Sequence, residues 1–127
     1  MVERPLWQLS AAELTDRTRA GRVSAEAAVA SAVERMRAIN PGLNAVVEDL
    51  GAEALQRARA LDAAVKAGAK PGPLHGVPVT IKVNVDQAGH ATTNGVVALK
   101  DMIAPADAPF VENMQNAGAV VIGRTNT

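Results

Sequence analysis

The chain has 127 residues, of which 48 % are hydrophobic and only 2 % aromatic, and its 13 basic and 13 acidic side chains cancel. This length fits one domain or part of a larger one, with a core built from Ala, Val, Leu and Ile. The balanced charge argues against a nucleic-acid or membrane-surface partner, and the absence of cysteine excludes disulfides, thiolate metal sites and a cysteine nucleophile. No stretch resembles a signal peptide or reaches the roughly 18 apolar residues of a membrane span, so we expect a soluble, cytoplasmic protein.

The front of the chain predicts two helices. Ser10, followed three residues later by Glu13, is a capping-box pattern that begins a helix, and Gly21 ends it. Ser24 is the expected N-cap of a second helix, which we expect residues 40–42, Asn-Pro-Gly, to end. The apolar stripe of this second helix consists of Val29, Val33 and Met36.

A short strand and a third helix follow. Residues 44–49 predict the strand, and residues 51 to about 67 predict a helix that Gly68 ends. Two pairs of opposite charges on this helix are spaced four residues apart with the acid first: Glu53 with Arg57 and Asp62 with Lys66. This spacing favours ion pairs on a solvated helix face, so we expect the charges to pair there.

Residues 79–83, Val-Thr-Ile-Lys-Val, predict a strand that follows the turn residues Gly76 and Pro78. Alternation places Thr80 and Lys82 on one face of the strand and the three aliphatic residues on the other. A buried ammonium needs a partner or gives up its proton, which makes Lys82 a candidate for chemistry. The alternative is that Lys82 lies on a sheet edge, where it discourages pairing with another chain.

The last third of the chain predicts a loop, a helix and a strand. Residues 87–100 are rich in loop-forming residues, and Asp107 is the expected N-cap of a helix over residues 107–117. The expected apolar face of that helix consists of Phe110, Val111, Met114 and Ala117. Residues 119–122 are fully apolar, as in strands buried on both faces. With the strand at 79–83 they predict a β-loop-α-β unit.

Several motifs over this part of the chain resemble those of the amidase signature family. In order, they are Gly72-Pro-Leu-His-Gly-Val-Pro-Val-Thr-Ile-Lys82, Asn84, Gly89, Thr92-Thr93, Asp107-Ala108, and Ala117-Gly-Ala-Val-Val-Ile-Gly-Arg-Thr-Asn126. The resemblance covers the whole chain and is specific from residue 72 to residue 126. It implies an α/β fold in which a helical N-terminal part precedes strands of a mixed central sheet flanked by helices. Residues 1–127 would then be the N-terminal portion of a single domain, with a helical front over about 1–70 and a sheet-forming part over about 71–127.

The resemblance also implies a reaction. The family hydrolyses carboxylic amides through an acyl-enzyme, without a metal or organic cofactor, using a lysine, a serine with a cis peptide bond and a serine nucleophile. The family lysine falls on Lys82. A neutral lysine can accept the proton of a nucleophilic serine through a second hydroxyl. Lowering its pKa from about 10.4 to neutral pH corresponds to roughly 4.6 kcal/mol, which requires a dry, closed site.

Other positions fit the family less completely. The family serines lie beyond the Gly-Arg-Thr-Asn motif, whereas the serines of this chain are Ser10, Ser24 and Ser31, so the chain alone is expected to be inactive. Val83 stands where the family commonly has Asp; the strand pattern points it away from Lys82, so the change is either tolerated or removes a polar contact from the site, and both alternatives stay open. Asn84, Thr92, Thr93 and Asn126 are expected to support the site loop. For the two threonines, for Asn126 and for Arg124, plain turn or hydrogen-bonding roles remain open.

These observations leave three functions. The first is an amidase acting on a small-molecule amide, represented here by its lysine-bearing part. The second is a non-catalytic fragment, in which the apolar strand at 119–122 lacks part of its sheet and drives self-association or partner binding. The third is a component of a tRNA-dependent amidotransferase that works with partner subunits. His75 and His90 have no cysteine or acidic ligand at metal spacing, so no metal is expected.

Overall fold

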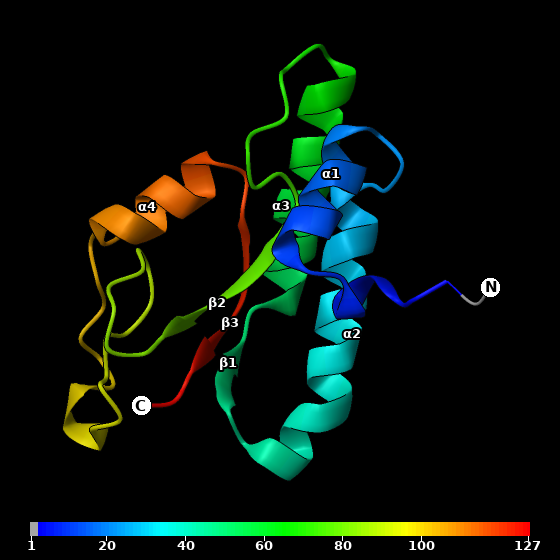
Figure 1. Ribbon diagram of the computed structural model, residues 1–127. Helices are drawn as coiled ribbons and strands as arrows, with labels where there is room; N and C mark the ends of the chain where they lie inside the picture. The colour runs from blue at the N-terminus through cyan, green and yellow to red at the C-terminus, as the bar shows by residue number, and fades with distance from the viewer. Residues whose placement is uncertain (1–2) are drawn as a thin grey trace.

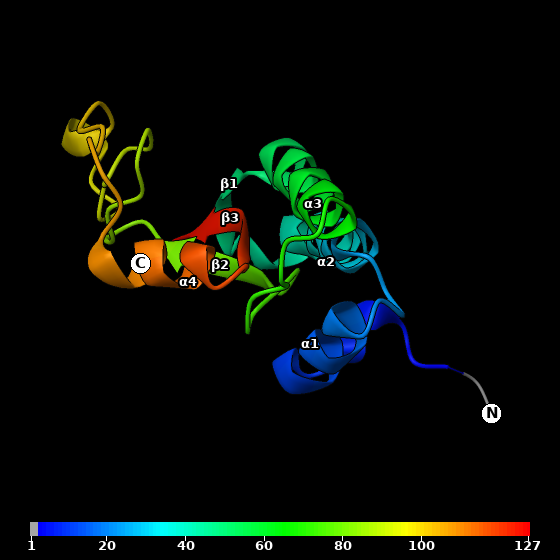
Figure 2. The ribbon, with the colours of Figure 1, turned by 90° about the horizontal axis from the view of Figure 1, so that it is seen from above.

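The computed structural model describes residues 3–127; the first two residues of the expected helical front lie outside this range. A three-stranded sheet forms the middle of the structure, with helices on both of its faces (Figures 1 and 2). In chain order the elements are η1 (Leu6–Gln8), α1 (Ala11–Arg19), α2 (Ala25–Leu43), β1 (Val46–Asp49), α3 (Gly51–Lys66), β2 (Pro78–Lys82), η2 (Val97–Leu99), α4 (Pro109–Asn116) and β3 (Val120–Thr125). Within residues 3–127, no helix has the length and apolar character needed to cross a membrane.

The strand order is β1-β3-β2, so β3 is the central strand. β2 runs parallel to β3, and β1 runs antiparallel to it. The expected α/β class is therefore confirmed, with a mixed sheet and the expected β2-loop-α4-β3 unit. Because β3 is paired on both sides, the open edges of the sheet belong to β1 and β2. Within the described residues, the apolar strand that would lack part of its sheet under the fragment alternative is paired on both sides.

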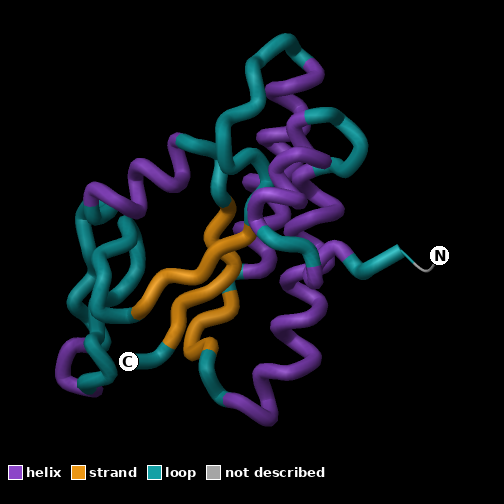
Figure 3. The backbone as a smooth tube through the Cα atoms, viewed as in Figure 1, coloured by secondary structure: helices purple, strands orange, loops and turns teal. Residues whose placement is uncertain are grey.

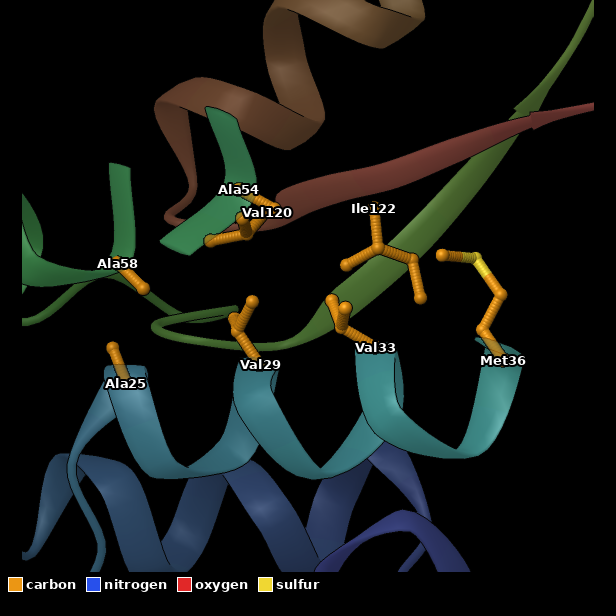
Figure 4. Packing of buried hydrophobic residues seen from close by; sticks show 8 residues of the cluster. All are labelled: Ala25, Val29, Val33, Met36, Ala54, Ala58, Val120 and Ile122. Atoms are coloured by element: carbon orange, nitrogen blue, oxygen red, sulfur yellow. The ribbon is translucent and has the colours of Figure 1, made fainter. Parts of the chain in front are cut away.

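One face of the sheet is covered by α2 and α3 (Figure 4). The apolar stripe of α2 packs there against small residues of α3 and against β3 side chains. This cluster consists of Ala25, Val29, Val33, Met36, Ala54, Ala58, Val120 and Ile122. Each of its larger aliphatic side chains contributes about 1.5–3 kcal/mol when fully buried, so the cluster is the main source of stability for the front of the chain.

The opposite face of the sheet is covered by α4 (Figure 2). Val111 of α4 is fully buried and packs with Ile81 of β2, Val121 of β3 and Leu50. Residues 121 and 122 of β3 thus belong to different clusters, which is the alternation expected of a strand buried on both faces. The predicted strand is confirmed in kind, but it begins at Val120 and continues past residue 122 to Thr125.

The helix starts in the front were predicted well, and one helix end was not. Ser10 and Glu13 form the capping box of α1, and the Ser24 hydroxyl accepts from the Ala27 amide at the start of α2. α2 continues past the expected stop and ends at Leu43, with Pro41 inside its last turn. Asn44 then takes up a left-handed conformation (φ 52°), and this residue, rather than the proline, ends the helix.

The prediction that α3 carries two ion pairs along its own surface was wrong. Among residues 3–127, neither pair forms. Both carboxylate oxygens of Asp62 instead accept backbone N–H groups at the start of α2, from Ala25 at 2.8 Å and from Glu26 at 3.0 Å. Arg57 donates to the Gln115 carbonyl of α4 at 2.8 Å. These side chains join α3 to other elements, which sequence spacing does not reveal.

The start of α4 also differs from the prediction. Its N-cap is Ala108, and no side chain accepts a hydrogen bond from the start of the helix. Asp107 accepts from the Ala88 amide at 2.7 Å and from the Gln115 side chain at 3.1 Å, so it holds the preceding loop instead of capping. Phe110, expected on the apolar face of the helix, is 51 % exposed, whereas Val111 next to it is buried.

Candidate functional site

The parallel strands β2 and β3 bring several predicted site residues to the edge of the sheet that the carboxyl ends of these strands form. Lys82 is the last residue of β2 and lies beside Thr125 of β3, whose carbonyl accepts from the Val83 amide at 2.9 Å. Asn84 follows β2, and Asn126 follows β3. Ligands in open α/β sheets bind beyond the carboxyl ends of parallel strands, and this edge is such a place.

Lys82 points away from the sheet core, as the alternation predicted. Ile81 and Val83 on either side of it are only 2 % and 4 % exposed, whereas Lys82 and Thr80 are exposed. Within the described part of the chain, Lys82 forms no ion pair. Residues 3–127 therefore leave its amine in water, and they do not supply the dry surroundings that a proton-accepting lysine requires.

A shallow cavity of about 340 Å³ lies next to this edge. Valines from β1 and from the segment after β2 form much of its lining, together with two of the predicted site residues, Thr93 and Asn126. The complete lining consists of Val47, Val83, Thr93, Gly95, Val96, Val97, Lys100 and Asn126. Lys82 is not part of it, although its neighbour Val83 is. A larger hollow of about 600 Å³ lies among the helices of the front and contains none of the predicted site residues.

The other predicted site residues have local hydrogen-bonding roles. The Thr92 hydroxyl donates to Asp86 at 2.5 Å, and the Thr93 hydroxyl accepts from the Gly95 amide at 3.2 Å. Asn126 donates to the Asn44 carbonyl at 3.0 Å, which ties the end of β3 to the end of α2. Asn84 is exposed in the turn after β2. The structure thus brings Thr93 and Asn126 into one cavity and leaves Asn84 and Thr92 on the loop around it.

The sequence pattern singled out Arg124 but did not predict that it is a buried charge beside this loop. Arg124 is completely buried, and no residue of comparable size is better shielded from water. Its Nη1 donates to the Gln87 side chain at 3.2 Å, and its Nη2 donates to the carbonyls of Val85 at 3.3 Å and Ala91 at 3.0 Å. The signal was present, because a single arginine interrupts an otherwise apolar strand. Its burial, however, depends on partners that arrive from 33 to 39 residues earlier in the chain.

Glu48 of β1 joins this arginine to a histidine. Its Oε2 lies 3.5 Å from Nε of Arg124, and its Oε1 lies 2.7 Å from Nδ1 of His90. A carboxylate can only accept, so Nδ1 of His90 carries a proton in this arrangement. Burial lowers the pKa of Arg124, whereas the negative charges of Glu48 and Asp86 act to raise it. An arginine keeps its charge in proteins, so the cluster is a buried cation held between carboxylates and carbonyls.

Gly76, expected to shape the turn before β2, does so through its backbone, whereas Pro78, the other expected turn residue, is the first residue of β2. Gly76 has φ 75°, and a Cβ placed there would lie 2.9 Å from the Cα atom of Ala25. The turn can therefore approach α2 only with glycine at this position. His75 is 4 % exposed, and its carbonyl accepts from the Thr18 hydroxyl at 2.6 Å, which is a structural role. Residues 3–127 contain no group of three or more His, Asp or Glu side chains placed to hold a metal ion.

Comparison with known proteins shows which family the chain resembles. A family model described as Amidase matches residues 27–127. The indoleacetamide hydrolase of Bradyrhizobium diazoefficiens is 54 % identical over 123 residues, which cover 97 % of this chain and 24 % of that protein. A glutamyl-tRNA(Gln) amidotransferase subunit of Carboxydothermus hydrogenoformans is 40 % identical over 121 residues, which cover 95 % of this chain and 25 % of that protein.

A solved structure is similar to nearly the whole chain as well. The crystal structure of a bacterial aryl acylamidase of the amidase signature family superposes with a TM-score of 0.88 at 30 % identity, covering 98 % of this chain and 26 % of that one. The chain thus spans about a quarter of the length of the relatives that it matches.

Proposed function

The chain belongs to the amidase family, and from that premise we propose that it is the lysine-bearing N-terminal portion of an enzyme that hydrolyses carboxylic amides. Lys82 at the carboxyl end of β2 carries this proposal. The motif around it continues through Asn126, and the parallel pairing of β2 with β3 brings both ends of the motif together. The match over nearly the whole chain to an indoleacetamide hydrolase supports the same reaction.

In the proposed reaction, Nζ of Lys82 is the general base. A serine hydroxyl attacks the amide carbonyl carbon, and its proton passes through a second hydroxyl to the neutral amine. The C–N bond then breaks, the leaving ammonia or amine takes that proton, and water hydrolyses the acyl-enzyme to the acid. Ser10, Ser24 and Ser31 are unsuited to this role, because two cap helices and the third accepts from the Trp7 amide.

The 127-residue chain by itself is accordingly proposed to be inactive. Lys82 is exposed in it, and its amine becomes a base only where further protein covers the β2 edge. The open edge of β2 and the apolar cavity next to the carboxyl ends of β2 and β3 are surfaces that such a covering would bury. Indoleacetamide is the first substrate to test, because it is the substrate named for a relative that shares 54 % of the aligned residues.

The test uses the full-length polypeptide that contains this chain. We expect Lys82→Ala to lower kcat for amide hydrolysis by about 10²–10⁴-fold, the usual contribution of a general base, with an unchanged circular dichroism spectrum. Lys70→Ala removes another exposed lysine of the same chain and is expected to leave kcat unchanged. Full activity of the Lys82→Ala enzyme would end the assignment.

Two alternatives make different predictions for the same molecule. The open edges of β1 and β2, together with the exposed side chains of Val97 and Met102, favour self-association of the 127-residue chain. Light scattering of the 127-residue chain distinguishes self-association from a monomer. The relative that belongs to a glutamyl-tRNA(Gln) amidotransferase supports a role in an assembly of that kind, and a requirement for partner proteins in the activity assay would favour it.

A further inference from the structure

The segment between β2 and α4, residues 83–108, has little regular structure of its own. Figure 3 shows it mostly as loop, with the short helix η2, and one isolated bridge joins Ala91 to Ile103; we call it the connecting loop. Large apolar side chains within it remain exposed, among them Val97 at 82 % and Met102 at 59 %. A loop of this length without a core of its own holds one shape only when other elements anchor it.

Arg124 of β3 is the first anchor. Its guanidinium contacts the connecting loop at three points: the Gln87 side chain and the carbonyls of Val85 and Ala91. Val85 lies three residues after Lys82, and Ala91 lies directly before Thr92. The rigid donor fork of arginine therefore sets the distance between the part of the loop that leaves the lysine and the part that carries the threonine pair.

Glu48 of β1 is the second anchor, and it acts from both of its oxygens. One oxygen lies beside Nε of Arg124, and the other accepts from Nδ1 of His90 at 2.7 Å. His90 belongs to the connecting loop, its side chain is 12 % exposed, and its carbonyl accepts from the Ala104 amide at 2.9 Å. On its other side, Nε2 of His90 lies 3.8 Å from Glu53 of α3. The carboxylate of Glu48 thus bonds to the loop and lies within ion-pair distance of the cation, whose Nε has no hydrogen-bond partner among residues 3–127.

We propose that Glu48, His90 and Arg124 form a positioning latch that holds the connecting loop, and with it Thr92 and Thr93, in a fixed place relative to Lys82. The latch residues do not touch the reacting atoms; they act through the loop that they hold. Displacement of a positioned group by about 1 Å can cost about 10²-fold in rate, so such a latch affects turnover even from outside the site. The proposal rests on the proposed function only for its catalytic consequence.

The experiment compares two latch variants with a matched control in the full-length polypeptide. Glu48→Gln keeps the shape of the side chain but removes its charge, and Arg124→Lys keeps the charge but removes the donor fork. The control is Arg37→Gln, because Arg37 pairs with Asp49 of the same strand β1, through an exposed contact that does not reach the loop. Hydrogen exchange measured by mass spectrometry reports on the loop, and kcat and KM report on turnover.

We expect both latch variants to speed exchange in peptides from residues 83–104 by about 10-fold or more, while peptides from α2 and α3 keep their protection. We expect kcat to fall by about 10–100-fold, with the larger effect for Arg124→Lys. We expect the control Arg37→Gln to change neither the exchange rate of the loop nor kcat. A loop that exchanges at the wild-type rate in Glu48→Gln overturns the latch. A uniform rise in exchange over the whole chain also overturns it, because that result shows a merely structural contribution.

Failure of the latch and failure of the proposed function give different results. One result is that the wild-type enzyme hydrolyses no amide while the variants speed hydrogen exchange in the loop alone. That result supports the latch and contradicts the amidase assignment. If the enzyme is an amidase that needs Lys82, yet both variants keep wild-type exchange and kcat, the assignment stands and the latch falls. Should Arg124→Lys fail to fold, the milder Glu48→Gln decides between these outcomes.

Discussion

The helical front and the connecting loop are held in place by different kinds of interaction. In the front, α2 and α3 bury a continuous apolar cluster against β3, and serine caps begin α1 and α2. The connecting loop buries few large apolar side chains, and polar groups of β1 and β3, together with its own Asp107, hold it instead. A region with its own core keeps its structure through many small contacts, whereas the loop depends on a few specific ones.

This difference has a consequence for function. The proposed base Lys82 is the last residue of β2, which pairs with the central strand β3, and the connecting loop that carries Thr92 and Thr93 begins directly after it. Loss of one contact in the core lowers the stability of the whole chain, because the core unfolds cooperatively. Loss of one contact in the loop frees that segment and leaves the rest folded.

The largest expected effect comes from the front. Met36→Ala removes a side chain that is 8 % exposed in the α2–α3–β3 cluster, and we expect it to lower the free energy of unfolding by about 2–5 kcal/mol. Urea denaturation followed by circular dichroism measures the change. Ile39→Ala, on the same helix but 37 % exposed, is the matched control and should cost clearly less. Equal losses for the two variants would show that the cluster is not the core of the front.

An intermediate effect is expected where α3 caps α2. Asp62→Ala leaves two backbone N–H groups at the start of α2 without their acceptor, and we expect a loss of about 1–2 kcal/mol by the same denaturation. Lys66→Ala should stay within about 0.5 kcal/mol of wild type, as for most surface changes. If Asp62→Ala and Lys66→Ala lower the free energy of unfolding by the same amount, Asp62 contributes through an ion pair along α3. Its hydrogen bonds to the start of α2 then add no stability.

The smallest effect on global stability is expected in the connecting loop. Thr92→Val removes the hydroxyl that donates to Asp86 and keeps the shape of the side chain, so we expect a change in the free energy of unfolding below about 1 kcal/mol. Faster amide exchange confined to residues 86–93 is the expected local result. Thr80→Val, at an exposed position on β2, controls for the loss of a hydroxyl alone. A large global loss in Thr92→Val would show that the loop belongs to the cooperative core.

The sequence by itself determined the features that depend on near neighbours in the chain. The Ser10 capping box, the Ser24 cap and the alternation through Lys82 need only a few adjacent residues, and the structure confirms each of them. The order of the family motifs from residue 72 to residue 126 identified the family, because several short patterns in a fixed order are far more specific than one.

Only the tertiary structure decided which distant groups meet. Asp62 accepts from residues 36 and 37 positions away, Arg124 donates to a loop 33 to 39 positions earlier, and Asp107 holds that loop instead of starting a helix. Asp62 and Asp107 had plausible local roles in the sequence and took distant partners instead, and nothing in the sequence showed which groups Arg124 would meet. The reason is physical: a polar side chain bonds to whichever unpaired group the folded chain brings within about 3 Å of it. Spacing along the chain does not contain that information.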